Sequence, residues 1–142
     1  MITSPIVIFH ILMGTLALAG GYVAVSVRKG DRLHRRAGTV FFFTMVGMSI
    51  SATWLAWVKE RPDSIIAGML ALYLITTSWM TVRRAENRTG WFEIAAMLGV
   101  LALGGYAIAT GFTAAQSAEG NIRGFPPGFF YFQAGLTLLC AL

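Results

Sequence analysis

The stretch TSPIVIFHILMGTLALAGGYVAVSV, residues 3–27, contains no Lys, Arg, Asp or Glu. A helix rises about 1.5 Å per residue, so about 20 apolar residues cross the roughly 30 Å hydrocarbon layer of a bilayer. No basic residue precedes the stretch, and it is too long for the apolar core of a secretory signal peptide. It therefore predicts a helix that spans a membrane.

The same pattern recurs along the whole chain. Apolar runs that predict transmembrane helices cover residues 5–27, 39–58, 64–82, 91–110 and 128–142. The last run spans only about 22 Å as a helix, and no polar tail follows it, so we expect it to be truncated. The sequence thus predicts an all-α integral membrane helical bundle with five visible transmembrane segments, in a single domain over residues 1–142.

Composition supports a membrane protein. Hydrophobic residues make up 56% of the chain and charged residues 12%, about half the usual globular share. A soluble domain of this size needs more polar cover. The net charge of +5 does not indicate nucleic acid, because the basic residues lie between the apolar runs. There they act as topology signals and contact anionic lipid head groups, so the expected partner is the lipid bilayer.

The loops predict the orientation of the chain. Five basic residues lie in residues 28–38, and the three later loops hold two, three and one. By the positive-inside rule the first and third loops are cytoplasmic, and the N-terminus and the 114–127 loop lie outside. Tryptophans near the ends of the runs are expected interfacial anchors: Trp54, Trp57, Trp79 and Trp91. The candidate residues for an anion or a lipid head group are Arg28, Lys29, Arg32, Arg35 and Arg36.

Small residues recur four positions apart within the runs, a pattern that lets membrane helices approach closely. The predicted helix-packing residues are Gly14, Ala17, Gly20, Gly21, Gly38, Gly99 and Gly105. The pattern predicts a tight bundle, formed within one chain, in a homo-oligomer or with another membrane protein.

A short internal match suggests a repeat. GTLALAGGY (residues 14–22) matches GVLALGGY (residues 99–106) if one residue is skipped. The two runs would cross the membrane in opposite directions, as in inverted-repeat transporters. However, one skipped residue turns a helix by about 100°, so the matched residues would not keep one face.

The two histidines are the candidate cofactor ligands. His10 shares a predicted helix face with Gly14, Ala17 and Gly21, so it is expected to face the packed interior. It could be a haem ligand, a metal ligand or a proton relay, or a neutral imidazole hydrogen-bonded to a neighbouring helix. His34 lies in the first basic loop, where it could contact solvent or lipid head groups. About 25 Å of helix separates them, so one haem would need a second ligand from elsewhere.

Other chemistry lacks support in the sequence. The single cysteine, Cys140, excludes an internal disulfide and a Cys-based zinc site, and no catalytic motif occurs. The acidic residues lie in predicted loops or at one helix start: Asp31, Glu60, Asp63, Glu86, Glu93 and Glu119. We therefore expect no catalytic or metal site, and a non-enzymatic accessory or assembly role. The alternatives are a protein that binds haem b or is linked to redox chemistry, and a small transporter.

Four segments also carry a family resemblance. They are FHILMGTLAL (residues 9–18), RKGDRLHRRAGTVFFFTM (28–45), RPDSIIAGMLALYLITTSW (61–79) and PPGFFYFQAGL (126–136). Together they resemble domain-of-unknown-function family 2306, small multi-pass proteins of the bacterial inner membrane with no assigned activity. The resemblance implies a periplasmic N-terminus and further membrane helix beyond residue 142.

Overall fold

The computed structural model describes residues 4–83 and 90–141, which form five helices and, within those ranges, no strand. The helices are α1 (Pro5–Ser26), α2 (Arg32–Val58), α3 (Pro62–Arg83), α4 (Trp91–Gln116) and α5 (Pro127–Leu139). Two arginines of the third predicted loop, Arg84 and Arg88, lie outside the described residues.

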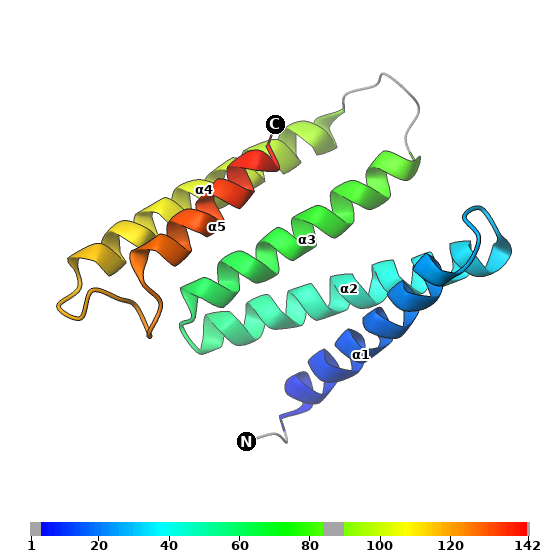
Figure 1. Ribbon diagram of the computed structural model, residues 1–142, viewed down its shortest axis with the longest axis horizontal. Coiled ribbons are helices and arrows are strands. Elements are labelled where there is room, and N and C mark those ends of the chain that lie inside the picture. The colour runs from blue at the N-terminus through cyan, green and yellow to red at the C-terminus, as the bar shows by residue number, and fades with distance from the viewer. Residues whose placement is uncertain (1–3, 84–89, 142) are drawn as a thin grey trace.

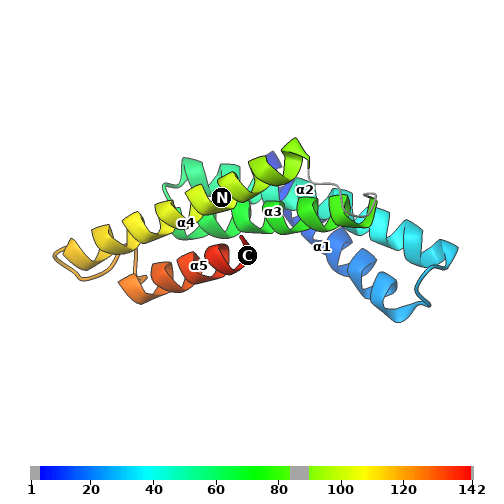
Figure 2. The same ribbon diagram turned by 90° about the horizontal axis from the view of Figure 1, so that it is seen from above.

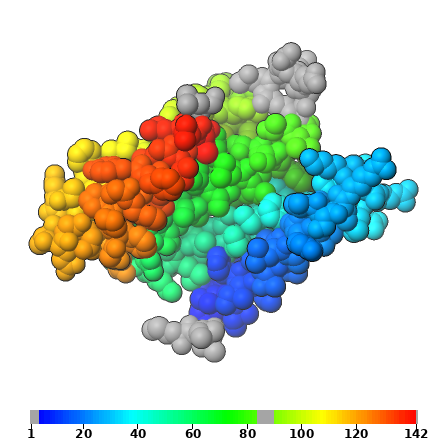
Figure 3. All heavy atoms as spheres, in the orientation of Figure 1, coloured from blue at the N-terminus to red at the C-terminus, as the bar shows by residue number. Residues whose placement is uncertain are grey.

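The helices run antiparallel to their neighbours in the chain (Figure 1). α2, α3 and α4 form a row, α1 packs on α2, and α5 packs mainly on α4 and lightly on α3. α5 overlaps α4 in Figure 1 but stands clear of it in Figure 2, so it lies on one face of the row. The space-filling view shows α2 and α3 uncovered between α1 and α5 (Figure 3).

Within the described residues, α1, α2, α3 and α4 are long and apolar enough to cross a membrane. α5 has 13 residues, about 20 Å of helix, and is not among these four. The all-helical prediction is therefore confirmed, together with four helices of spanning length. A fifth spanning segment stays a prediction.

Three helices extend beyond the predicted apolar spans. α2 begins at Arg32 rather than residue 39, because Asp31 caps it and accepts a hydrogen bond from the Arg32 amide at 2.7 Å. Asp is a favoured N-cap residue, and Arg and Leu favour the helix that follows. α4 continues to Gln116 rather than residue 110, because Gly111 and Ala114 are buried.

α3 also begins earlier than predicted. Pro62 is its first residue, a position where the missing amide proton of proline costs no hydrogen bond. Asp63 consequently lies in the first turn of α3, not in a loop, and its residue is only 6% exposed. The first turn of α3 thus contains a buried polar residue, Asp63.

The buried core lies where α3, α4 and α5 meet. Its fully or nearly buried members are Ile66, Leu103, Ala107, Ala114, Phe130 and Ala134. Elsewhere large apolar side chains are open, among them Leu18 at 79% and Trp91 at 87% exposure. A soluble protein rarely exposes so much contiguous apolar surface, whereas lipid covers it in a membrane.

Candidate functional site

α1 and α2 approach each other at small residues. A Cβ on Gly20 would lie 3.3 Å from the Phe41 amide nitrogen, and one on Gly21 would lie 3.1 Å from the Phe41 ring. A Cβ on Gly14 would lie 3.3 Å from the sulfur of Met48, and Ala17 is buried. The helices can approach this closely because these positions lack larger side chains.

Three other predicted packing residues have free space within this chain. Among the described residues, no atom of another helix lies within 4 Å of a Cβ built on Gly38, Gly99 or Gly105. Their role as packing residues stays a prediction. Such packing would be against another molecule.

The structure also packs glycines that the sequence pattern did not single out. A Cβ on Gly104 would lie 2.8 Å from the Thr137 hydroxyl, one on Gly111 would lie 2.6 Å from the Tyr131 ring, and one on Gly68 would lie 2.5 Å from the Thr53 hydroxyl. Spacing alone could not separate Gly104 from its neighbour Gly105, because both lie in the same run of small residues.

The matched segments on α1 and α4 do not keep equivalent faces. Gly14 packs on α2 whereas its counterpart Gly99 is open, and Leu18 is exposed whereas its counterpart Leu103 is buried. The residue match therefore does not extend to matching helix surfaces.

His10 faces α2. Its Nδ1 lies 3.2 Å from the Met48 carbonyl oxygen and 3.0 Å from the Ser51 hydroxyl. Ser51 itself donates to the Met48 carbonyl at 2.9 Å. Because both neighbours then accept, Nδ1 carries the proton and Nε2 keeps its lone pair.

His34 lies in the first turns of α2 and joins that end of α2 to the end of α1. Its Nδ1 donates to the Ala24 carbonyl oxygen at 2.9 Å. A carbonyl only accepts, so the neutral ring again has Nε2 unprotonated. Residues 34 and 48 on α2 are separated by about 21 Å of helix, so the two imidazoles occupy opposite ends of the α1–α2 pair.

A buried polar contact joins α3 to α5. The amide nitrogen of Gln133 donates to the Asp63 backbone carbonyl at 3.1 Å. The Asp63 carboxylate accepts from Arg61 at 3.1 Å and from the Ser64 hydroxyl at 2.8 Å. No sequence pattern predicted this contact, because Asp63 and Gln133 are far apart in the chain and share no motif.

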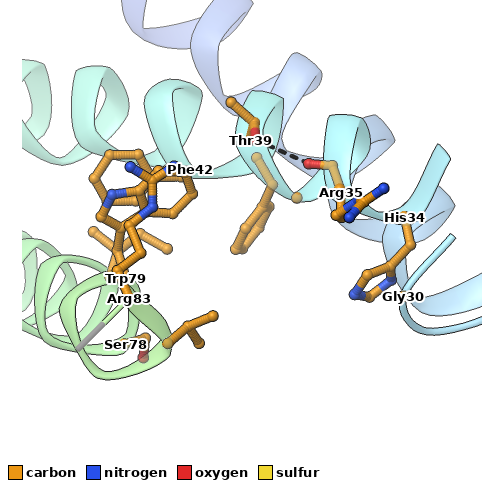
Figure 4. Close-up of a pocket in the computed structure, with 12 residues that line it drawn as sticks. Gly30, His34, Arg35, Thr39, Phe42, Ser78, Trp79 and Arg83 are labelled. Carbon is orange, nitrogen blue, oxygen red and sulfur yellow. Dashed lines mark hydrogen bonds between the residues drawn. The ribbon is translucent and has the colours of Figure 1, made fainter. Parts of the chain in front are cut away.

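A groove of about 570 Å³ opens between α2 and α3 at the end that holds the 28–31 turn. We call it the basic groove; its lining includes His34, Arg35, Phe41, Phe42, Trp79 and Arg83. The Trp79 ring stacks on Phe42 with centroids 4.1 Å apart, and the Arg83 guanidinium lies 3.9 Å over Trp79 (Figure 4).

Only one of the five predicted head-group residues, Arg35, lines the basic groove. The other four are exposed and do not line it: Arg28, Lys29, Arg32 and Arg36. The sequence analysis did not predict Arg83 as a lining residue of the groove. Its contact with Phe42 and Trp79 depends on how α2 and α3 pack.

A second groove, of about 350 Å³, lies between α3 and α4. We call it the α3–α4 groove; α3 contributes Met69 and Tyr73, and α4 contributes Ala95, Ala96 and Gly99. On the α4 side these three small residues lie among the larger Phe92, Val100 and Leu103.

Residues 4–83 and 90–141 contain no group of three His, Cys, Asp or Glu side chains placed to hold a metal ion. Comparison with protein-family models, with curated proteins and with solved structures found no match to this chain. The resemblance to family 2306 consequently stays a prediction.

Proposed function

We propose that this chain is a non-enzymatic, multi-pass protein of a bacterial inner membrane, with its N-terminus in the periplasm, that serves as an accessory or assembly partner of other helices. Its four long apolar helices and open apolar surface support the membrane location. The alternation of basic loops supports the orientation. Membership of family 2306 and a fifth spanning segment belong to the same proposal.

The α3–α4 groove carries the partner role. Lipid tails are as apolar as leucine, so membrane helices associate where small residues let their backbones approach. Ala95, Ala96 and Gly99 present such a surface, and no atom of another described helix lies within 4 Å of a Cβ on Gly99. The partner helix would come from a second copy or from another membrane protein.

The experiment is photo-crosslinking in membranes with a photoreactive residue at position 95. The expected result is one discrete protein adduct, and Gly99→Ile should remove most of it. A Cβ on Gly99 meets no atom of another described helix within 4 Å, so we expect the added side chain to enter the groove with little change to the fold. The matched control places the photoreactive residue at Tyr22, which is 77% exposed on α1.

Lipid adducts alone at position 95 would contradict the proposal. So would a protein adduct that is equally strong at position 22, because it would report random collisions in the membrane. An adduct of twice the chain's mass would identify a second copy as the partner.

A second candidate function is haem binding, and the hydrogen bonds of the histidines support it. In both His10 and His34, Nδ1 faces a backbone carbonyl oxygen. Such a bond fixes the tautomer in which Nε2 has the lone pair that a haem iron takes. Each histidine would supply one axial ligand, and the second would come from outside this chain.

An absorption spectrum of the protein in mild detergent, oxidised and then reduced, tests this candidate. Haem binding predicts a Soret band that is lost in His10→Ala or in His34→Ala. A featureless spectrum after expression with added haem would exclude it.

A further inference from the structure

The basic groove combines an apolar floor with a cationic rim. Phe41, Phe42 and Trp79 supply aromatic surface, and Arg35 and Arg83 supply charge. The lining residues include no carboxylate, and within residues 4–83 and 90–141 neither arginine forms an ion pair. Arginines without an ion-pair partner beside an apolar groove favour a ligand with an anionic head group and an apolar tail.

The stacked arrangement prepares Arg83 for a phosphate. The guanidinium carbon lies 3.9 Å from the centre of the Trp79 ring, a cation–π contact. Within the described residues, the N–H donors of Arg83 form no hydrogen bond. Those donors match two oxygens of a phosphate. The aromatic stack also holds the side chain in place, which lowers the entropy lost on binding.

The position of the groove fits a membrane lipid. It opens at the end of the molecule that has the larger number of basic residues, predicted to face the cytoplasm, where anionic lipids attract Lys and Arg. Its volume of about 570 Å³ lies within the range of sites for small molecules, and it can therefore hold a head group with part of one acyl chain.

We propose that the basic groove binds one anionic phospholipid of that leaflet, with its phosphate held by Arg83 and attracted by Arg35, and an acyl chain against Phe42 and Trp79. This site is separate from the α3–α4 groove, and it does not depend on the partner helix proposed above.

Trp79 makes the proposal measurable. A variant that keeps only this tryptophan (Trp54→Phe, Trp57→Phe, Trp91→Phe) would be placed in phosphatidylcholine vesicles. Small amounts of brominated phosphatidylglycerol or brominated phosphatidylcholine would be added, because bromine quenches tryptophan on contact. Half-quenching is expected at about tenfold less phosphatidylglycerol than phosphatidylcholine, the ratio that one charge-assisted pair can supply. A control variant that keeps only Trp57, outside the groove, should give a ratio near one.

Three substitutions decide whether the site or the overall charge causes the preference. Arg83→Gln and Arg83→Lys should both lower the ratio several-fold, because Lys keeps the charge but loses the flat, forked donor group. Arg28→Gln, a cation outside the groove, should leave it unchanged. The ratio is taken within each variant, so changes in the brightness of Trp79 cancel, and circular dichroism confirms that the helices persist.

Equal quenching by the two lipids would overturn the proposal. Full preference in Arg83→Lys, or an equal loss in Arg28→Gln, would also overturn it, because either result would mean that diffuse surface charge attracts the lipid.

Discussion

The α1–α2 and α4–α5 pairs are both antiparallel hairpins, but they are held together in different ways. α1 lies directly against the α2 backbone, since a Cβ on Gly20 would meet the Phe41 amide nitrogen at 3.3 Å. In the second hairpin, glycines of α4 lie beneath side chains of α5: Gly104 beneath Thr137 and Gly111 beneath Tyr131. Side chains can rotate away from an added methyl group, whereas a helix backbone cannot.

The hairpins also differ in their polar contacts. In the first, His10 and His34 link α1 to α2 near its two ends. In the second, the long polar contact is made to a third helix, where Gln133 of α5 reaches the Asp63 carbonyl of α3. The polar contacts between α1 and α2 thus lie within the first hairpin, while the second hairpin has a polar contact to α3. Both hairpins pack on α3, the first through α2, where Gly68 lies against Thr53.

The largest expected effect comes from Gly20→Leu. The new side chain would meet the α2 backbone, so α1 and α2 must separate, at a cost of about 3 kcal/mol. Unfolding in mixed micelles, followed by circular dichroism, would measure the loss. Gly105→Leu is the matched control, because a Cβ on Gly105 meets no atom of another described helix within 4 Å. Equal losses in the two variants would mean that the backbone contact does not hold the hairpin.

A smaller effect is expected for Gln133→Leu. The substitution removes the hydrogen bond between α5 and α3, which should lower the free energy of unfolding by about 1 kcal/mol. The same measurement applies, with Gln116→Leu as the control at an exposed position on α4. The variant should also increase hydrogen exchange in α5 and leave α1 unchanged. Faster exchange in both hairpins would contradict a local effect of the Gln133 hydrogen bond on α5.

The smallest expected effect is the coupling between His10 and Ser51. The variants His10→Ala and Ser51→Ala, alone and together, form a double-mutant cycle. Hydrogen bonds between membrane helices average about 0.6 kcal/mol, and we expect a coupling energy of that size. A coupling energy of zero would show that each side chain bonds to the Met48 carbonyl independently.

The sequence predicted the helices well and their ends poorly. Long uncharged runs identify helices of spanning length, but the Asp31 cap and the burial of Ala114 set where α2 begins and α4 ends. Hydropathy shows only where the apolar run ends. Hydrogen bonds and packing extend the helix beyond that point.

The candidate sites were predicted only in part. The histidines and Arg35 stood out by residue type, but the stack of Phe42, Trp79 and Arg83 did not, because it joins two helices that meet only in the fold. The interfacial role of Trp79 stays a prediction, and its ring also packs against Phe42 of the same chain.

In the proposed membrane location, α2 is longer than the hydrocarbon layer is thick. Its 27 residues extend about 40 Å, against about 30 Å of hydrocarbon. In that location, residues 39–58 would match the hydrocarbon thickness, and residues 32–38, which include Arg35, would extend beyond it as rigid helix. A thicker bilayer would draw this segment inward or reduce the helix tilt. The depth of the basic groove would thus follow the thickness of the surrounding membrane.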